Sequence, residues 1–364
     1  MSRIVIDARE SGTSTGRYVD KLIEYLYALK PDHRIIILTK TLRVDFMKKV
    51  APTFEIVESN FKEFTFAEQL GFLRQLKSLR PDLVHFTMTQ QPVLYKGEKV
   101  TTIHDLTTAR FDNPAKNAFI YRFKQAVYRY VINQVAKSSA QLITPSKYVK
   151  EDVARFTKVN PNKITVTYEA ADKITAMPEP VERLRGKKFI MYVGRPTPHK
   201  NLPKLIEAFA VLRNQNPELI LALAGKTDKN YQAVQELVVK KRMSDSVVFT
   251  GFISEGQLRW MYEKTAAYVF PSLSEGFGLP ALEAMAHGAP VASSNATCLP
   301  EVYGDAAHYF NPLDTQDMAV KIAAVINNAT LRQELIEKGR AQSKSYSWKD
   351  MAEQTLSVYD KAIR

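Results

Sequence analysis

The sequence lacks several features that would place the protein outside the cell or in a membrane. Cys298 is the single cysteine among 364 residues, so no disulfide can form within the chain. No run of about 18 apolar residues is present, which excludes a membrane-spanning helix. The apolar stretch after Met1 is too short for a signal peptide. Together with 45% hydrophobic and 24% charged residues, these absences predict a globular protein of the reducing cytoplasm.

Motifs that hold a metal ion or a nucleotide phosphate are also missing. No two aspartates are separated by one residue, so the sequence has no Asp-x-Asp motif that could hold a divalent metal with a nucleotide sugar. It contains no Walker A loop and no His-Glu-x-x-His. One cysteine also excludes a cysteine-rich zinc site. We therefore expect no cofactor and no obligatory metal, and any diphosphate would be neutralised by Arg, Lys and helix N-termini.

Acidic residues are under-represented, above all in the first half. The formal charge is +13, and residues 1–172 hold 27 basic against 18 acidic residues, a net of +9. Between Arg110 and Lys150 eight basic residues accompany one acid, Asp112. Such an excess indicates a phosphate-bearing substrate, an anionic membrane surface or nucleic acid, or else a solvated helix face.

Short apolar runs rich in β-branched residues alternate with amphipathic segments, which predicts parallel sheets covered on both faces. The predicted strands are 4–6, 35–38, 83–86, 100–103, 141–144, 189–193, 219–224, 247–249, 267–270, 290–292 and 307–310. The predicted helices are 18–29, 118–136, 202–213, 231–241, 255–264, 279–287 and 348–363.

The strand–helix alternation occurs in two series. A proline-containing stretch without periodicity, residues 173–188, separates them and is predicted to be a linker. We expect an α/β protein of two doubly wound Rossmann-like domains, 1–172 and 189–345, facing across a cleft. The terminal helix within 346–364 is expected to cross back to the first domain.

In parallel sheets, ligands bind beyond the carboxyl ends of the strands. Residues 275–283 follow a predicted strand and place Glu275 and Glu283 eight positions apart, around Gly278 and the start of a helix. Carboxylates there could accept hydrogen bonds from sugar hydroxyls, and the helix N-terminus suits a diphosphate. Arg195 and Lys200, after another strand, could neutralise a leaving diphosphate. A surface glutamate, a glycine loop and an exposed basic loop are the alternatives.

The first half offers weaker candidates. His104 ends a predicted strand and could bind substrate or transfer protons, with Asp105 orienting it, although a lone histidine is more often structural. Gly16, at the start of the first helix, could approach a phosphate, and Arg17 follows it. Asn201 is a plausible N-cap of the helix after it.

Taken together, these motifs resemble retaining glycosyltransferases of family 4, which have the GT-B fold. Residues 271–280, Pro-Ser-Leu-Ser-Glu-Gly-Phe-Gly-Leu-Pro, and the Glu-x7-Glu spacing carry most of the resemblance. Residues 192–195 with 200–201, 299–302, 102–106 and 16–18 are similar to further elements of the family. Ser14 stands where the family often has the first glycine of its N-terminal loop.

The resemblance implies a role for each matching residue. Glu275 would contact donor sugar hydroxyls and Glu283 the ribose, while Arg195 and Lys200 would bind the diphosphate. His104 would touch the sugar near the reacting carbon. Further substrate contacts would come from Gly16, Arg17, Ser146, Phe277, Gly278 and Leu279.

The implied reaction moves a hexose from a nucleotide diphosphate sugar to an acceptor hydroxyl, with retained anomeric configuration. The resemblance favours mannose from GDP-mannose, with UDP-sugars close behind, and an acceptor that is a glycan or lipid-linked precursor of polysaccharide assembly. The basic, aromatic segment 119–130 could hold a lipid-phosphate acceptor or dock peripherally on the anionic inner face of the membrane. The alternative is a half-buried core helix with a solvated basic side. A GT-B epimerase and a non-catalytic sugar-nucleotide sensor stay open as alternatives. Nucleic acid is not an expected partner, because no recognition helix or RNA motif is evident.

Overall fold

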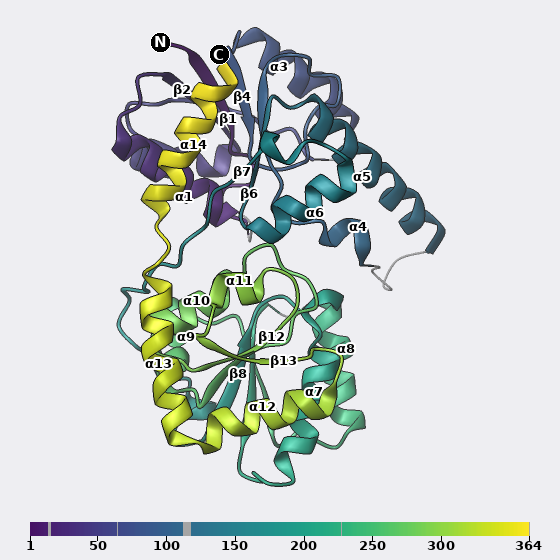
Figure 1. The fold of residues 1–364 in the computed structure, drawn as a ribbon, viewed down its shortest axis with the longest axis vertical. Helices are drawn as coiled ribbons and strands as arrows, with labels where there is room; N and C mark the ends of the chain where they lie inside the picture. Colours follow the sequence, from purple (N-terminus) through teal and green to yellow (C-terminus); the bar gives the residue numbers. More distant parts are fainter. Residues whose placement is uncertain (14–15, 64, 112–117, 227, 364) are drawn as a thin grey trace. The chain divides into compact units, whose positions relative to one another are not determined.

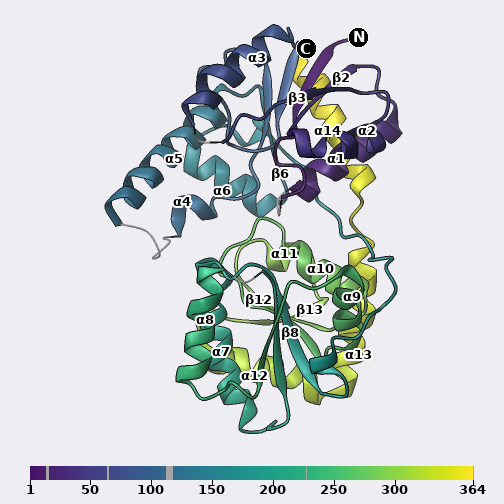
Figure 2. The same ribbon diagram turned by 180° about the vertical axis from the view of Figure 1, so that it is seen from behind.

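The computed structural model describes residues 1–13, 16–63, 65–111, 118–226 and 228–363. The chain forms two compact units, each shown in Figures 1 and 2. The first comprises Met1–Arg110, Lys116–Glu169 and Ser347–Arg364; the second comprises Phe111–Ala115 and Ala170–Tyr346.

The first unit is built on a seven-stranded parallel sheet in the order β3-β2-β1-β4-β5-β6-β7. Its central strands β1 and β4 are mostly apolar and, apart from Arg3, buried, because helices cover both faces. The strands are β1 Arg3–Asp7, β2 Arg34–Thr39, β3 Glu55–Glu58, β4 Leu83–Phe86, β5 Lys99–Thr102, β6 Gln141–Thr144 and β7 Ile164–Val166.

Helices of the first unit come from both ends of the chain. They are α1 Gly16–Leu29, α2 Val44–Val50, α3 Leu73–Ser78 after the π-turn Glu68–Phe72, α4 Thr107–Arg110, α5 Ala118–Ser138, α6 Lys147–Thr157 and α14 Trp348–Ile363. The last of these, α14, packs against α1 and the strands β4, β5 and β6 (Figures 1 and 2). Its buried face is formed by Trp348, Met351, Ala352, Thr355, Val358 and Tyr359.

The second unit is built on a six-stranded parallel sheet in the order β10-β9-β8-β11-β12-β13. The strands are β8 Phe189–Val193, β9 Ile220–Ala224, β10 Val247–Gly251, β11 Ala267–Phe270, β12 Val291–Ser294 and β13 Ala307–Phe310. The helices are α7 Leu202–Arg213, α8 Lys229–Lys240, α9 Glu255–Lys264, α10 Leu279–Ala286, α11 Leu299–Tyr303, α12 Thr315–Asn327 and α13 Ala329–Ser343.

The α/β class and the doubly wound sheets predicted from the sequence are confirmed. Two strands escaped prediction, β3 and β7, because each is short and lies toward or at an edge of its sheet. The sequence placed the end of the first domain at residue 172, whereas the first unit ends at Glu169. Among the described residues, no helix is both long and apolar enough to cross a membrane.

Candidate functional site

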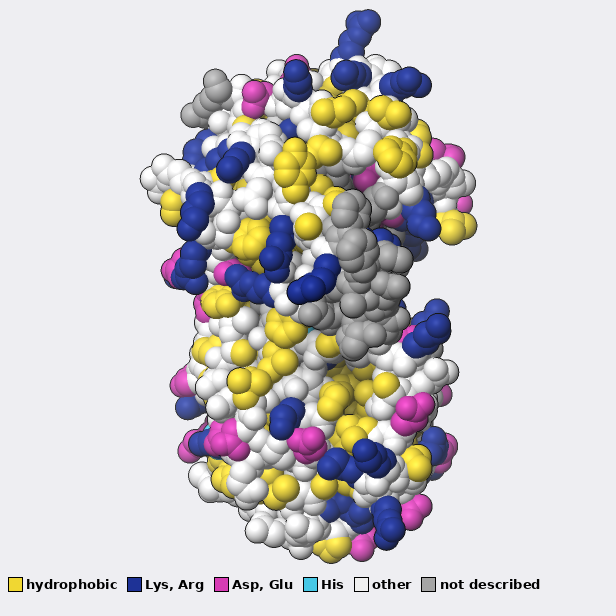
Figure 3. Space-filling view, turned by 90° about the vertical axis from the view of Figure 1, so that its right-hand side faces the viewer, with side chains coloured by type: hydrophobic (Ala, Val, Ile, Leu, Met, Phe, Trp, Pro, Cys, Tyr) yellow, Lys and Arg dark blue, Asp and Glu magenta, His cyan; other side chains and the backbone are white. Residues whose placement is uncertain are grey.

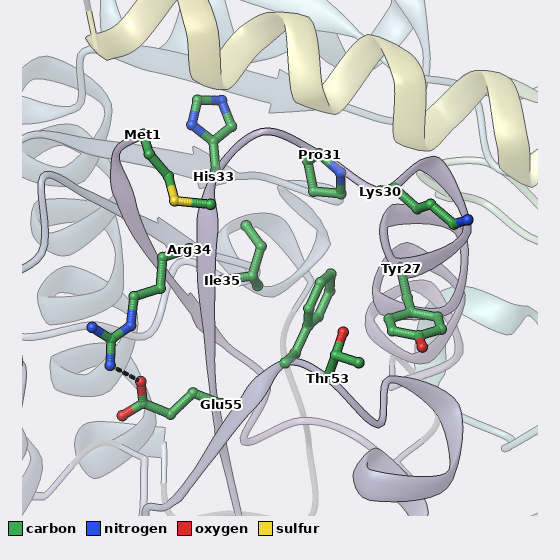
Figure 4. A pocket seen from close by; sticks show the side chains of 10 residues that line it. Met1, Tyr27, Lys30, Pro31, His33, Arg34, Ile35, Thr53 and Glu55 are labelled. Carbon is green, nitrogen blue, oxygen red and sulfur yellow. Dashed lines mark hydrogen bonds and ion pairs between the residues drawn. The ribbon is translucent and has the colours of Figure 1, made fainter.

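A cavity of about 740 Å³ lies at the amino end of β2. Figure 4 shows its lining, which includes Met1, Tyr27 and His33, and the 2.7 Å ion pair between Arg34 and Glu55. Ligands of doubly wound proteins bind at the opposite edge, beyond the carboxyl ends of the strands. We therefore describe the candidate residues at the carboxyl edge of each sheet separately.

In the second unit, the neighbouring strands β8 and β11 form the switch point of the sheet. The chain leaves β8 toward β9 on one side, whereas β11 leads to β12 on the other. The loops that follow, residues 194–201 and 271–278, therefore diverge at the carboxyl edge. Such a crevice is the usual ligand position in a doubly wound sheet.

Hydrogen bonds tie these two loops together. The His199 carbonyl accepts from the Leu273 amide at 2.7 Å. The Asn201 side-chain amide donates to the carbonyls of Pro271, at 3.1 Å, and Pro312, at 2.8 Å. Asn201 occupies the N-cap position of α7, as expected, but its side chain makes no capping bond. The predicted N-cap position of Asn201 is confirmed, and its side-chain amide joins loops instead of capping the helix.

Lys200 and Glu275 meet where the tied loops face each other. Lys200 Nζ lies 2.5 Å from Glu275 Oε1, with the two side chains 20% and 12% exposed. The ammonium group also lies 5.7 Å from the centre of the Phe270 ring. The Glu275 backbone is fixed by its amide, which donates to Thr297 Oγ1 at 3.2 Å, and by its carbonyl, which accepts from Cys298 Sγ at 3.3 Å. The Lys200 ammonium group and the Glu275 carboxylate are thus held in contact at a partly buried position.

Arg195 lies on the same loop but in a different environment. Its side chain is 74% exposed, and its Nε lies 2.9 Å from Asp228 Oδ2. Asp228 caps α8 by accepting from the amides of Asn230 and Tyr231. Desolvation would raise the pKa of Asp228, but the Arg195 hydrogen bond and the two amides outweigh it and lower the pKa. The Arg195 guanidinium is paired with Asp228 rather than with Glu275.

The N-terminus of α10 requires glycine before it. Gly278 has φ of 94°, and a Cβ there would lie 2.1 Å from Tyr303 Oη, which donates to the Gly278 carbonyl at 2.6 Å. Phe277 before it is 4% exposed and packs edge-on against Tyr346. Leu279 is the first helical residue, and Glu283, one turn further on, is 7% exposed. Amides at this N-terminus are placed to bind an anion.

In the first unit, His104 follows β5 and is bound through both ring nitrogens. Nε2 lies 3.0 Å from the Thr87 carbonyl, which can only accept, so Nε2 carries a hydrogen. Nδ1 lies 3.3 Å from Glu169 Oε1. Burial alone would lower the pKa of His104, but the hydrogen bond and charge of Glu169 and the Thr87 carbonyl raise it. This geometry favours an imidazolium.

The sequence named the wrong orienting partner for His104. Asp105 Oδ1 instead accepts from the Thr107 amide at 2.7 Å, at the start of α4. Glu169, 65 positions further along the chain, supplies the carboxylate. The one signal that could have identified it is its place just after β7, because that carboxyl end lies on the same edge of the sheet as β5.

The remaining first-unit candidates have separate surroundings. Gly16 begins α1, and a Cβ there would lie 2.2 Å from the Glu10 carbonyl oxygen, so no larger residue fits. Arg17 is exposed. Ser146 is buried and caps α6 by accepting from the Val149 amide at 3.2 Å. Ser14 lies outside the described residues.

The two doubly wound parallel sheets, one in each unit, are those of the GT-B fold class. Residues 15–173 match the family described as Glycosyltransferase Family 4, and residues 174–342 match Glycosyl transferases group 1. The chain belongs to the glycosyltransferases of family 4.

Curated relatives include two mannosyltransferases of bacterial O-antigen. The O-antigen chain mannosyltransferase B of Escherichia coli is 30% identical over 71% of this chain and 69% of its own length. The O-antigen chain mannosyltransferase RfbU of Salmonella typhimurium is 30% identical over 58% of this chain and 56% of its own length.

Solved structures support the fold. Sucrose-phosphate synthase from Thermosynechococcus elongatus has a TM-score of 0.78 at 19% identity and covers 99% of this chain and 98% of its own. Anabaena HepE, solved with UDP and glucose, has a TM-score of 0.75 at 14% identity and covers 99% of this chain and 100% of its own. Both confirm the GT-B architecture expected from the sequence.

Proposed function

We propose that the protein is a retaining hexosyltransferase that moves mannose from GDP-mannose to a hydroxyl of a glycan or lipid-linked acceptor in polysaccharide assembly. The observation that carries the proposal is the Lys200–Glu275 pair at the switch point of the second unit. Mannose is favoured because the curated relatives named above are mannosyltransferases of O-antigen.

The donor would bind at the carboxyl edge of the second unit. Lys200 would approach the diphosphate, and Glu275 would accept hydrogen bonds from sugar hydroxyls, since an ionised carboxylate has only acceptor sites. Glu283 would hold the ribose. The amides from Phe277 to Leu279 would face the phosphates at the N-terminus of α10. Arg195 would leave Asp228 to reach the diphosphate, since its exposed side chain is free to rotate around its stem.

The reaction would proceed on one face of the sugar. The bond between the anomeric carbon and the diphosphate oxygen breaks, and the acceptor oxygen bonds to the same face of that carbon. The acceptor proton passes to the departing phosphate oxygen. Lys200 and the α10 amides stabilise the charge on the leaving diphosphate. His104 keeps the role that the family resemblance implies, a contact with the sugar near the reacting carbon, and no metal is required by this route.

Thermal-shift measurements with GDP-mannose, UDP-glucose and UDP-galactose test the donor. We expect the largest stabilisation with GDP-mannose, because a ligand that binds only the folded state raises its stability. Incubation with the donor alone should give no epimerised sugar, whereas an epimerase would produce one. Transfer to an acceptor with inverted configuration, or binding with no turnover on any acceptor, would contradict the proposal.

The first unit carries a basic surface that favours an anionic partner. On α5, Arg122, Lys124 and Arg129 are exposed, and Tyr130 is 60% exposed. Figure 3 shows Lys and Arg side chains interspersed with hydrophobic ones on a face of this unit. The side chains of residues 118–121 and 123, which belong to the predicted docking segment, lie outside the described ones. We propose that this surface docks on anionic lipid at the inner face of the membrane.

A further inference from the structure

A separate cavity of about 650 Å³ lies in the second unit, away from the candidate donor residues. Its walls are residues 173–175, α9, the end of α10 and α13. The helices α10 and α13 pack against each other (Figure 1). The volume is within the range of about 300–1,000 Å³ that is usual for small-molecule sites. Nothing in the proposed transfer reaction uses this cavity.

The charged side chains that line the cavity are mainly cations. Lys173, Arg259 and Arg340 supply three positive charges, and Glu263 supplies one negative charge. Glu263 pairs with Arg259, whose Nε lies 2.8 Å from Glu263 Oε1. Lys173 and Arg340 form no ion pair within the described part of the chain. Three cations and one carboxylate leave a net charge of +2 around one cavity.

The nearby end of α10 does not account for this excess. The helix ends at Ala286, and the carbonyl groups of a helix C-terminus carry about half a negative charge. One cation is enough to offset that charge, whereas two of the cations here have no carboxylate partner. The cavity therefore keeps a positive potential, which attracts anions.

His287 adds a hydrogen-bond donor to the lining. The Ile174 amide, which can only donate, lies 3.0 Å from His287 Nε2. Nε2 must therefore accept, and the hydrogen of the ring is on Nδ1. Burial, together with the cations of the cavity, lowers the pKa of His287, which keeps the ring neutral near pH 7. The ring is also stacked on Tyr262, with the centroids 5.9 Å apart at an angle of 13°.

The backbone around Gly288 makes room for the Arg340 guanidinium. Gly288 has φ of 79°, and a Cβ there would lie 2.7 Å from Arg340 Nη2 and 3.2 Å from Nε. At Gly339, a Cβ would lie 3.0 Å from Met285 Cγ, so α13 approaches α10 closely where Arg340 projects. The two glycines thus bring a guanidinium without a carboxylate partner up to the end of α10.

We propose that this cavity binds a phosphate dianion, either as inorganic phosphate or as the phosphomonoester end of a larger molecule. Near pH 7 such a group carries a charge of about −1.5 to −2, which matches the net charge of the lining. Arg340 binds two phosphate oxygens through its planar fork, Lys173 neutralises the remaining charge, and His287 Nδ1 donates a further hydrogen bond. The anion links residues 173–174, just after the unit boundary at Glu169, to α10 and α13.

Titration with inorganic phosphate, without any nucleotide, tests the site. Nitrogen-detected NMR follows the six histidines, and the His287 signals are assigned by their loss in His287→Gln. In the wild-type protein we expect hydrogen on His287 Nδ1 alone, and a shift of these signals at about millimolar phosphate. Isothermal titration calorimetry then gives the dissociation constant.

Arg340→Gln and Lys173→Gln should each weaken phosphate binding about three- to tenfold, because each removes a charge-assisted contact from a partly exposed site. Both side chains are exposed, so both variants should fold. Lys338→Gln is the matched control: it removes one positive charge from α13, but Lys338 Nζ lies 3.1 Å from Asp305 Oδ2, outside the cavity. Lys200→Gln removes a cation from the candidate donor site and should leave the His287 shift unchanged.

Two further probes identify the source of the phosphate group. Glycerol phosphate offers a soluble monoester, and phosphatidylcholine vesicles with phosphatidic acid offer the same group on a lipid. A His287 shift with glycerol phosphate supports a soluble ligand, and vesicle binding that Arg340→Gln abolishes supports a headgroup. A response to neither restricts the ligand to inorganic phosphate.

Three results would overturn the site: no His287 shift with phosphate, a shift that Lys200→Gln abolishes, or Arg340→Gln binding phosphate as tightly as Lys338→Gln. Absence of sugar transfer by the wild-type protein would overturn the proposed function instead. The phosphate titrations need no donor or acceptor, so they decide the site in either case.

Discussion

Replacement of Glu275 gives the sharpest test of the candidate donor site. In Glu275→Gln the side chain keeps its shape and one acceptor oxygen but loses the charge that faces Lys200. In Glu275→Ala both are lost. If Glu275 holds the sugar hydroxyls while Lys200 faces the diphosphate, turnover should fall in both variants, and further in the second.

The expected size follows from the 2.5 Å contact between Lys200 Nζ and Glu275 Oε1. At an effective dielectric constant of about 20, the Coulomb attraction at that distance is about 7 kcal/mol. Desolvation of the two groups offsets most of it, so the net loss on truncation is about 1.5–3 kcal/mol. A similar loss from the transition state corresponds to about 10–100-fold in kcat/KM, the smaller value for Gln and the larger for Ala.

Initial rates with saturating acceptor measure this effect, and circular dichroism melts show whether the fold is kept. Each kcal/mol lowers the melting temperature of a unit of this size by about 2–4 °C, so both variants should be folded at 25 °C. Glu207→Ala is the control, because it also removes a carboxylate that pairs with a lysine. Glu207 lies 3.1 Å from Lys204 on the surface of α7. Glu275→Ala with kcat/KM within about twofold of the Glu207→Ala value would refute the assignment.

Four further outcomes are expected. Arg195→Ala should lower turnover at least about tenfold with little change in melting temperature, because its ion pair is exposed; near wild-type transfer would remove Arg195 from the site. Transfer should survive EDTA, and loss that Mn²⁺ reverses would contradict the metal-independent route. The protein should float with vesicles containing anionic phosphatidylglycerol more than with neutral phosphatidylcholine vesicles; equal flotation would argue against docking. The folded pKa of His85, about 3, lies below its unfolded value near 6.5. The free energy of unfolding should therefore fall by up to about 1.4 kcal/mol per pH unit as pH falls from 6.5 to 3. Denaturant titrations of the wild type and of His85→Gln should differ in this slope.

Local patterns predicted most of the strands but fewer of the helices, since α6, α12 and α13 were not predicted. The helices α7 and α9 and the strands β4, β6, β8, β11 and β13 have the predicted bounds, because buried parallel strands are continuous apolar runs and their covering helices have an apolar stripe. Prediction failed for β3, where Glu-Ile-Val-Glu is too polar and short to stand out. Strand pairing, rather than composition, makes that segment a strand.

The loop that ends at Gly278 shows how much of the candidate site could be predicted from the sequence. Gly278 and the helix beginning at Leu279 could be predicted, because glycine before a helix with proline in its first turn is a local signal. The facing of Lys200 and Glu275 was an expectation from family resemblance. The two residues are 75 positions apart in the chain, and their contact depends on the adjacency of β8 and β11 in the sheet.

The sequence by itself determined the class of fold, the family and the loops that carry the candidate donor residues, because these depend on residues close together in the chain. Only the tertiary structure decided that Glu169 pairs with His104, that Asn201 joins two loops, and that Tyr359 reaches His85 across 274 positions. Burial decides such partners: a polar group taken out of water needs a partner, and the packing of distant segments determines which one it finds.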